Sequence, residues 1–312
     1  MDKLFTLLLI FSVSFTGLSL TKDDTDFKDI IILKKDTIEY HFVQTPDLFT
    51  NKWHLLPQPL FWKKVMKLSP DSCVLNVART RQILRVESLE NWNRLTDDEK
   101  ELARVKLREV YNLDSTERIF MTTGKRNFYQ FDLVYSSIKR AIKIFKDNDT
   151  DPWFAQAILM IESPGKLEKS VAGAYGPFQL MKSVARKHGL RVDKYVDERK
   201  DFDKSAYGSA HLLRTSCIPE AKRIMRKFGV IVTTKMEKQL WFRLLVLHNY
   251  HAGAGNVENV LTNVVKPNCG CQSVITKIWQ STYGRFGNSS QNYSQLALAS
   301  LLVLDEFISD EN

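Results

Sequence analysis

The sequence predicts a mostly α-helical protein, and three observations lead to this prediction. Several segments repeat apolar residues at intervals of three and four, which is the spacing of one helix face. Residues that cap or stop helices bound many of these segments. No block with the period-two alternation of a half-buried strand stands out. We therefore expect a helical domain preceded by an N-terminal region that is itself largely helical.

The first residues are typical of an export signal. Lys3 gives a positive start, Leu4 to Phe15 is apolar, and Gly17 and Ser19 have the small-residue spacing that a signal peptidase reads. We expect residues 1–19 to be a signal peptide, because an uncleaved anchor would need a longer apolar stretch. The sequence thus predicts an exported protein of the periplasm or cell envelope.

Residues 20–125 form a predicted accessory region. Its first part, to about residue 50, is mixed and polar, as in an extended leader, and the remainder is expected to be largely helical. The clearest helix in it is Glu99 to Tyr111. Thr96 can cap this helix, and Glu99 three residues later completes the pattern of a capping box.

The C-terminal region, residues 126–312, contains most of the predicted helices. Asp132 to Phe145 is amphipathic, and Asp151 with Pro152 can start the next helix. That helix is expected to run from Trp153 to about Glu162, where Ser-Pro-Gly stops it. Further helical patterns cover Phe178–His188, Ser205–Arg214, Lys235–His248 and Tyr293–Phe307. Leu296 to Leu304 is apolar but too short to span a bilayer, so we expect no transmembrane segment after signal cleavage.

Glu162 is the main candidate for a catalytic group. The segment before it, Trp153 to Ile161, carries no charge and is expected to be buried on most sides. Apolar burial and the negative end of the helix dipole both raise the pKa of a carboxyl group at this position. A carboxylic acid that stays protonated near neutral pH can donate the proton that glycosidic bond cleavage requires. The alternative is a glutamate at the solvated end of a core helix.

Three segments together resemble the lytic transglycosylase family. Ile161 to Pro164 places a serine after the glutamate, as the family does at its catalytic acid. Ala172 to Met181 is similar to the family's Gly-Ala-x-Gly-x-x-Gln-x-Met segment, and Tyr250 to Val257 is similar to its Tyr-Asn-Ala-Gly-x-Gly segment. The resemblance covers roughly residues 126 to 307. It implies a lysozyme-like helical catalytic domain that acts on peptidoglycan glycan strands.

A fourth stretch narrows the resemblance to one branch. Gly189-Leu190, Val196 to Arg199 and Asp201 lead into Ser205 to Leu213, which resembles the membrane-bound murein transglycosylase D branch. One departure is His251, which stands where the family usually has Asn. Either side chain can form a hydrogen bond to a sugar or to the backbone, and a structural histidine is the alternative reading.

The resemblance implies a role for each residue of the candidate site. Glu162 would act alone, first as acid and then as base, to form a 1,6-anhydro sugar. Ser163 and Tyr250 would orient Glu162 or the substrate, and Gln179 would contact sugar substituents. Gly173 and Gly176 would let the backbone approach the glycan. The remaining candidates for substrate binding are Tyr175, Met181, His251, Ala252 and Tyr293.

The acidic residues that follow Glu162 are better explained as local structure than as a second catalytic carboxylate. We interpret them as a solvated face or as local caps, and they are Asp193, Asp197, Glu198, Asp201 and Asp203. Two other functions stay open: a lysozyme-type hydrolase on the same fold, and a non-catalytic peptidoglycan-binding scaffold. Hydrolysis of a glycosidic bond usually requires a second carboxyl group, so the role of these acidic residues helps to distinguish a hydrolase from a transglycosylase.

The formal net charge of +9 suits an anionic polymer or membrane surface, although solubility alone could also explain it. No nucleic-acid-binding motif or phosphate loop appears in the sequence. We expect no cofactor and no metal. Other cell wall enzymes or envelope proteins are candidate partners.

Four cysteines can oxidise in an exported protein, and they are Cys73, Cys217, Cys269 and Cys271. Four cysteines allow three pairings, and the sequence does not choose among them, although we expect Cys217 to pair with Cys269 or Cys271. A zinc site is a weaker alternative, because Cys269-Gly-Cys271 lacks a second closely spaced pair of ligands.

Overall fold

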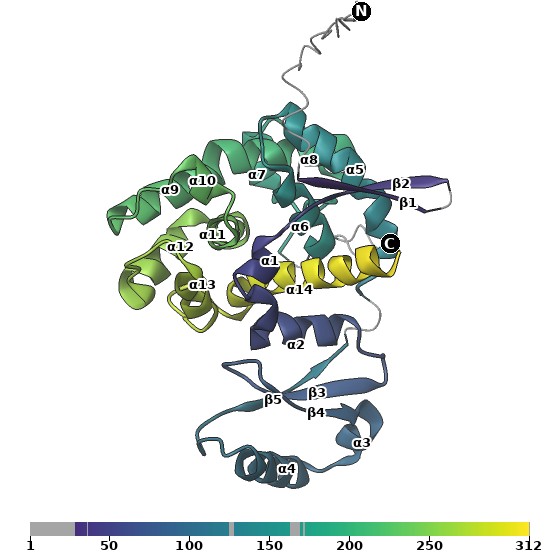
Figure 1. The fold of residues 1–312 in the computed structure, drawn as a ribbon, viewed down its shortest axis with the longest axis vertical. Coiled ribbons are helices and arrows are strands. Elements are labelled where there is room, and N and C mark those ends of the chain that lie inside the picture. The colour runs from purple at the N-terminus through teal and green to yellow at the C-terminus, as the bar shows by residue number, and fades with distance from the viewer. Residues whose placement is uncertain (1–28, 36, 125–127, 163–168, 171, 312) are drawn as a thin grey trace, which may run out of the picture.

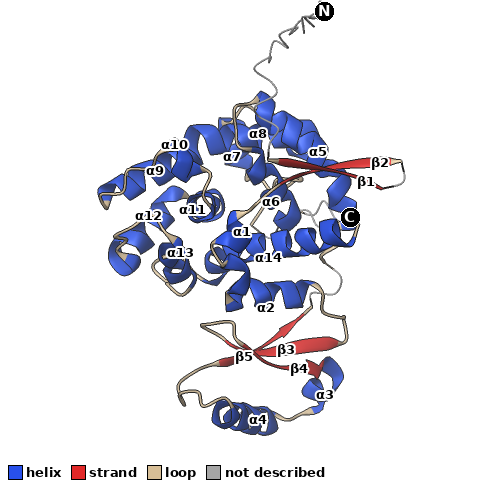
Figure 2. Cartoon of the chain, viewed as in Figure 1, coloured by secondary structure: helices blue, strands red, loops and turns tan. Residues whose placement is uncertain are grey.

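The predicted fold class is confirmed by a computed structural model, in which helices dominate (Figure 2). The structure describes residues 29–311 except 36, 125–127, 163–168 and 171. In this part of the chain, no helix is both long and apolar enough to cross a membrane. The predicted signal peptide, residues 1–19, lies outside the described residues.

The main body is a helical domain built around three buried helices. These are α6 (Pro152–Glu162), α11 (Leu240–Ala252) and α14 (Asn288–Asp310), and α14 contacts both of the others. Figure 1 shows α14 crossing the centre of this body. The surrounding helices are α5 (Asp132–Asp147), α7 (Lys182–Lys187), α8 (Phe202–Leu212), α9 (Ile218–Lys227), α10 (Thr234–Glu237), α12 (Ala254–Val260) and α13 (Gln272–Trp279).

Short helical turns of other kinds extend some of these helices. The π-helical turn η4 (Leu213–Cys217) joins α8 to α9, and a second one, η5 (Leu261–Val265), follows α12. A 3₁₀ turn, η3 (Glu198–Lys200), precedes α8. The predicted helix over Lys235–His248 is therefore two helices, α10 and α11, and the one predicted over Phe178–His188 begins only at Lys182.

Two helices, α6 and α4, start at the capping signals in the sequence, whereas α8 and α14 start three and five residues before the predicted Ser205 and Tyr293. The Asp151 carboxylate accepts a hydrogen bond from the Trp153 backbone N–H at 3.0 Å, with Pro152 in the first turn of α6. The capping box at Thr96 and Glu99 is present at the start of α4 (Asp97–Val110). Capping depends only on neighbouring residues, which explains why these two helices and their first residues could be predicted from the sequence.

The N-terminal segment is part of the main body. Strands β1 (Ile30–Lys35) and β2 (Ile38–Val43) form an antiparallel hairpin, followed by α1 (Asp47–Thr50), the 3₁₀ turn η1 (Trp53–Leu55) and α2 (Pro57–Met66). Buried residues of these elements, including Phe42, Trp53 and Phe61, belong to the main hydrophobic core. The extended leader expected up to residue 50 is therefore wrong from Ile30 onward.

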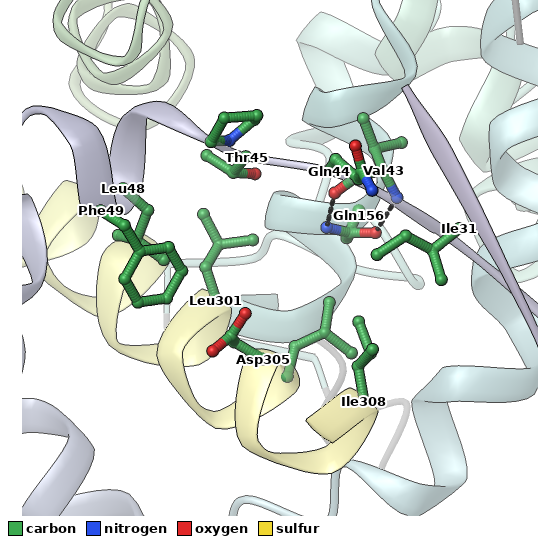
Figure 3. A pocket seen from close by; sticks show the side chains of 12 residues that line it. Ile31, Val43, Gln44, Thr45, Leu48, Phe49, Gln156, Leu301, Asp305 and Ile308 are labelled. Carbon is green, nitrogen blue, oxygen red and sulfur yellow. Dashed lines mark hydrogen bonds between the residues drawn. The ribbon is translucent and has the colours of Figure 1, made fainter. Parts of the chain in front are cut away.

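A side chain of the central helix α6 holds this hairpin in place. The Gln156 amide donates to the Val43 carbonyl at 3.1 Å, and its carbonyl accepts from the Val43 N–H at 2.8 Å (Figure 3). The same region lines a mostly apolar groove of about 250 Å³ beside α14. Gln156 is fully buried, so this pairing satisfies polar groups that would otherwise be costly in the core.

Between α2 and α5 the chain forms a small α/β module. Strands β3 (Ser72–Val77), β4 (Ile83–Ser88) and β5 (Ile119–Thr123) make an antiparallel sheet in the order β4-β3-β5, and α3 (Leu89–Arg94) and α4 lie between β4 and β5 in sequence. Figure 1 shows the module next to α2, with α4 farthest from the main body. One face of the sheet has its own small core with Trp92 and Leu107, whereas Val74 joins the main core.

This module adds a feature that the sequence did not predict. The region after about residue 50 contains this sheet in addition to the helices α2, α3 and α4. The central strand β3 is buried from Cys73 through Val77, so its sequence shows no alternation of polar and apolar residues. The boundary after residue 125 does not separate two cores, since residues before 69 share the core of the C-terminal region.

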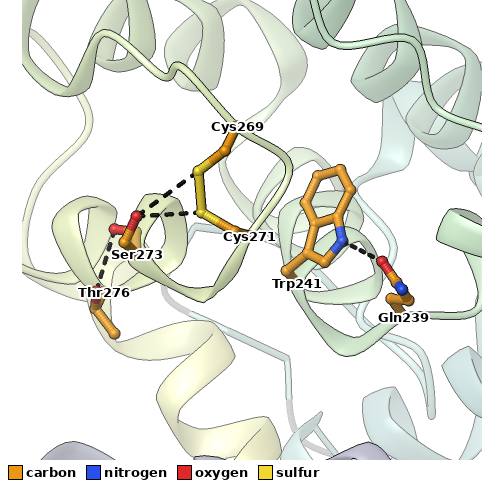
Figure 4. The surroundings of a disulfide bond; sticks show 6 residues. All are labelled: Gln239, Trp241, Cys269, Cys271, Ser273 and Thr276. Atoms are coloured by element: carbon orange, nitrogen blue, oxygen red, sulfur yellow. Dashed lines mark hydrogen bonds between the residues drawn. A yellow bond between two sulfur atoms is a disulfide. The ribbon is translucent and has the colours of Figure 1, made fainter. Parts of the chain in front are cut away.

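The expected pairing of Cys217 is wrong. The structure joins Cys269 to Cys271, and Figure 4 shows this disulfide beside Trp241. Gly270 between them packs against the Trp241 ring, where an added Cβ would lie 2.6 Å from a ring carbon. Cys73 and Cys217 are buried free thiols.

Candidate active site

A cavity of about 570 Å³ opens beside the C-terminal end of α6, and Glu162 lines it. The rest of its wall comes from the segment before α7, from α7, from the end of α8 with η4 and α9, from the C-terminal end of α11 with the start of α12, and from the start of α14. The structure brings five of the predicted site residues to this cavity: Glu162, Gln179, Met181, Tyr250 and His251. Segments that are far apart in the sequence therefore meet around one carboxyl group.

Glu162 has the electrostatic environment that the sequence indicated. Residues 153–161 before it are all buried, and Glu162 itself is half-buried at the cavity wall. Burial raises the pKa of Glu162 from the ordinary value of 4.5 to about 7, and the nearby Tyr293 hydroxyl partly opposes this increase. The carboxyl group is thus protonated in a substantial fraction of molecules at neutral pH.

Three tyrosines surround this carboxyl group. The charge of Glu162 contributes to raising the pKa of Tyr129, Tyr250 and Tyr293, although burial is the larger cause in each case. The Tyr293 hydroxyl is buried, and its interaction with the Glu162 carboxyl group adds to the raised pKa of Tyr293. The Tyr293 ring stacks on His251, with ring centroids 4.5 Å apart. The Tyr293 hydroxyl therefore remains able to interact with the carboxyl group of Glu162.

Tyr250 connects three parts of the site. Its hydroxyl donates to the Phe178 carbonyl at 2.6 Å and lies 3.1 Å from the Ser209 hydroxyl. It therefore links α11 to α8 and to the segment before α7. Because Tyr250 donates its hydroxyl proton to the Phe178 carbonyl, the Tyr250 oxygen can only accept a hydrogen bond from the protonated carboxyl group of Glu162.

The glycine-containing segment before α7 is held by a buried arginine. The Arg199 guanidinium pairs with Asp197 at 2.7 Å and donates to the carbonyls of Gly173 and Leu180 at 2.9 and 3.0 Å. Gly176 has φ +85°, and a Cβ there would lie 1.7 Å from the Arg199 carbonyl oxygen. Gly176 is therefore required by contact with Arg199, whereas a Cβ at Gly173 would meet only open space.

Gln179 has a left-handed backbone with φ +45°, which is uncommon for a residue other than glycine. Its side-chain amide donates to the Gly176 carbonyl at 3.0 Å. This local hydrogen bond supports the conformation and leaves the side chain at the cavity wall. Such backbone strain often occurs where a side chain must be presented to a ligand.

Several predicted residues do not line the cavity. Tyr175 lies beside the cations of Arg199 and Lys200, each 5.7 Å from its ring centroid. Ala252 is half-buried at the end of α11. Gly173, Gly176 and Tyr293 also lie outside the cavity lining, although Tyr293 contacts its wall through His251. Ser163 lies outside the described residues.

The acidic residues downstream of Glu162 serve as local caps and ion pairs. Asp201 caps α8 through the Lys204 N–H, and Asp193 accepts from the N–H groups of Tyr195 and Val196. Asp197 supports Arg199, as described above, and Asp203 pairs with Arg140. None of these carboxylates is among the described residues that line the cavity.

The sequence did not identify other residues of this site. Tyr129, just before α5, is near Glu162 but lies outside every recognised segment. Buried Asn249 lines the cavity and donates to the Cys217 carbonyl at 3.0 Å. Glu220 also lines the cavity and accepts from Arg223 at 2.8 Å. Among these residues, only Asn249 could have been suspected from the sequence, because it precedes Tyr250 in a segment that resembles the family.

A pair of histidines lies at one side of the same cavity. His188 lines it, and its Nδ1 is 3.0 Å from the Nδ1 of His211. Burial lowers the pKa of His188, and the nearby His211 adds to this effect. For a hydrogen bond between these two atoms, one Nδ1 must donate and the other must accept, so the accepting ring has to be neutral.

Comparison with known proteins identifies the segment that contains this site. Residues 139–268 match the family model described as Transglycosylase SLT domain. No curated protein and no solved structure matches the chain. The matched segment includes Glu162, the glycine-containing segment and Tyr250, but it ends before Tyr293 and begins after Tyr129. This match supports a transglycosylase SLT domain at residues 139–268, a lysozyme-like helical domain whose family indicates peptidoglycan activity of the lytic transglycosylase type.

Proposed function

We propose that this protein is a peptidoglycan lytic transglycosylase that cleaves the β-1,4 bond between N-acetylmuramic acid and N-acetylglucosamine. The observation that carries this proposal is the carboxyl group of Glu162, which lines a cavity and has a pKa raised to about 7. A proton donor with such a pKa suits general acid catalysis near neutral pH. The SLT family match at residues 139–268 supports the same substrate class.

In the proposed reaction Glu162 acts twice. Its protonated carboxyl group donates a proton to the bridging oxygen, and the bond from that oxygen to C1 of N-acetylmuramic acid breaks. Positive charge develops at C1, the 6-hydroxyl of the same sugar attacks C1, and its proton returns to the Glu162 carboxylate. The products are a 1,6-anhydro end and a free 4-hydroxyl, and no water is consumed. An internal nucleophile has a high effective concentration, which offsets the lack of a second catalytic carboxylate.

The surrounding residues support these two roles. The Tyr293 hydroxyl can donate to the Glu162 carboxylate after the first proton transfer, when the negative charge is present. Gln179, Met181 and His251 lie where they can contact the sugar, because they line the same cavity. His251 in place of the family's usual Asn keeps a group that can form hydrogen bonds. Burial lowers the pKa of His251, which favours the neutral form of its ring.

A lysozyme-type hydrolase is the second candidate, and one observation favours it. Glu220 is a second carboxylate that lines the cavity of Glu162. In a hydrolase it could activate water or stabilise positive charge at C1. Its carboxylate is engaged by Arg223 at 2.8 Å, which is the reason that we prefer the single-acid reaction.

The proposal is tested on purified peptidoglycan sacculi with the wild type, Glu162→Gln and Glu220→Gln. We expect soluble muropeptides with 1,6-anhydro ends from the wild type and from Glu220→Gln, and none from Glu162→Gln. If the wild type instead produced muropeptides with reducing ends, and both variants produced none, the protein would be a hydrolase. Binding of sacculi without release by the wild type would establish a non-catalytic scaffold.

We further propose a role in cell wall remodelling at the periplasm or envelope, which follows from the export signal expected at residues 1–19. Membership of the murein transglycosylase D branch is proposed on the sequence between Gly189 and Leu213. Fractionation of expressing cells tests the location, and retention of the protein in the cytoplasm would contradict it. Pull-down from envelope extracts tests other wall enzymes as partners of the module at residues 72–123.

A further inference from the structure

The turn between β3 and β4 reaches from the small module to the start of α14. Arg81 in this turn has a left-handed backbone with φ +63°, and the residue is only 8% exposed. Its guanidinium donates to the side-chain carbonyl oxygens of Asn288 and Asn292, at 3.0 and 3.1 Å. The same group lies 5.4 Å and 5.6 Å from the ring centroids of Phe61 and Trp62. Arg81 therefore joins the module, α2 and α14 at one point.

The environment of Arg81 is unusual for a buried cation. In the part of the chain that the structure describes, its polar partners are neutral amides and no carboxylate pairs with it. Burial of the guanidinium lowers the pKa of Arg81, which indicates that its desolvation is not fully compensated. A planar group with several donors is suited to bridging two amides one helical turn apart. An apolar residue would pack between Phe61 and Trp62 without desolvating a charge, so stability alone does not explain the arginine.

The part of α14 held by Arg81 carries residues of the active site. Asn288 and Asn292 lie on one side of the helix, one turn apart, and Ser289 and Tyr293 follow them on the adjacent side. Ser289 lines the cavity, and Tyr293 stacks on His251 beside Glu162. Gly287 at the start of α14 provides no side-chain cap, so the first turn depends on such outside contacts.

We propose that Arg81 is a positioning residue for glycan cleavage, acting through the first turns of α14 to keep Tyr293 against His251 and Glu162. This inference rests on the proposed transglycosylase function. It also assigns a role to the module at residues 72–123, which lies outside the SLT domain and supplies Arg81. Because Arg81 lines no part of the cavity, its effect must pass through α14.

The test is a double-mutant cycle with Arg81→Met and Tyr293→Phe, measured as release of anhydro-ended products from glycan strands. We expect Arg81→Met to lower kcat about 10-fold with little change in KM, because it misplaces a group that acts at the reacting centre. If Arg81 acts through Tyr293, the double variant will be no slower than the slower single variant. Arg79→Met is the matched control, because Arg79 lies in the same turn but is exposed and contacts Gln280 and Glu117 instead.

Two outcomes would overturn the inference: wild-type kcat in Arg81→Met, or effects of the two substitutions that multiply in the double variant. Should Arg81→Met fail to fold, Asn288→Ala replaces it in the cycle, since Asn288 is exposed and its loss removes one of two acceptors. A carboxyl NMR titration of Glu162 gives a readout that does not need turnover. The pKa of Glu162 should change in the same direction in Arg81→Met and Tyr293→Phe, and an unchanged value in Arg81→Met would also overturn the inference. Lack of turnover by the wild type would instead contradict the proposed function.

Discussion

Replacing Glu162 by Gln should stabilise the protein at high pH while it abolishes cleavage. Burial raises the pKa of Glu162 from 4.5 to about 7, so the folded protein holds a proton there that the unfolded chain releases near pH 4.5. The contribution of the neutral carboxyl group is fully present below pH 4.5 and is lost as the pH rises to about 7. At about 1.4 kcal/mol per tenfold difference, the cost of the charged form is about 3 kcal/mol, or about 2 kcal/mol when solvent access is considered.

Thermal unfolding at pH 4.5 and pH 8.5 measures this contribution directly. Gln is neutral and close in shape to a protonated Glu, so the two proteins should melt together at the lower pH. At the higher pH Glu162→Gln should melt about 4–8 °C above the wild type, given about 2–4 °C per kcal/mol for a chain of this size. A difference in Tm that does not depend on pH would refute the argument that burial holds this carboxyl group neutral.

Glu258→Gln is the matched control for that experiment, because its expected effect has the opposite sign. Hydrogen bonds from Arg223 and then Lys227 lower the pKa of Glu258 to about 2. Its stabilising contribution is therefore present above pH 4.5 and is lost as the pH falls toward 2. Glu258→Gln should melt at or below the wild-type temperature at pH 8.5, and any increase would show that the Glu162 effect is not specific.

Three further predictions concern activity, the segment before α7 and the cysteines. The kcat for product release should fall as the pH rises through about 7, since Glu162 must be protonated to act as the acid, and a rate that keeps rising to pH 9 would contradict that role. Arg199→Met should lower the free energy of unfolding by about 3–5 kcal/mol, because it leaves the mostly buried carboxylate of Asp197 without its partner. Urea unfolding measures this change, and a loss below about 1 kcal/mol would contradict the described network. In the absence of reductant, a thiol reagent should modify Cys73 and Cys217 in the unfolded protein and no cysteine in the folded protein. When reductant is added to the unfolded protein, all four cysteines should react, because the bond between Cys269 and Cys271 is then broken. Reaction of Cys73 or Cys217 in the folded protein would contradict their burial.

Local sequence signals predicted much of the helical fold. The capping box at Thr96, the start of α6 at Asp151 and Pro152, and the uncharged run before Glu162 each depend on neighbouring residues only. Such features can be read from the sequence because helix periodicity and capping are local properties. The candidate carboxyl group could be predicted for the same reason.

Features that depend on distant contacts could not be predicted. Strand β3 is buried on both faces, so its residues resemble any apolar segment. Gly176 was expected to approach a glycan, and only the folded structure shows that the Arg199 backbone occupies the space beside it. Tyr129 reaches Glu162 from outside all recognised segments. The pairing of Cys269 with Cys271, rather than with Cys217, likewise depends on three-dimensional placement.

The central claim is that one buried acid cleaves the glycan without using water, and digestion of sacculi in water labelled with heavy oxygen tests it most directly. The account predicts that the wild type releases muropeptides whose new ends carry no label, and that Glu162→Gln releases none. New ends that each carry one labelled oxygen would contradict the account, because water rather than the sugar's own hydroxyl would then be the nucleophile.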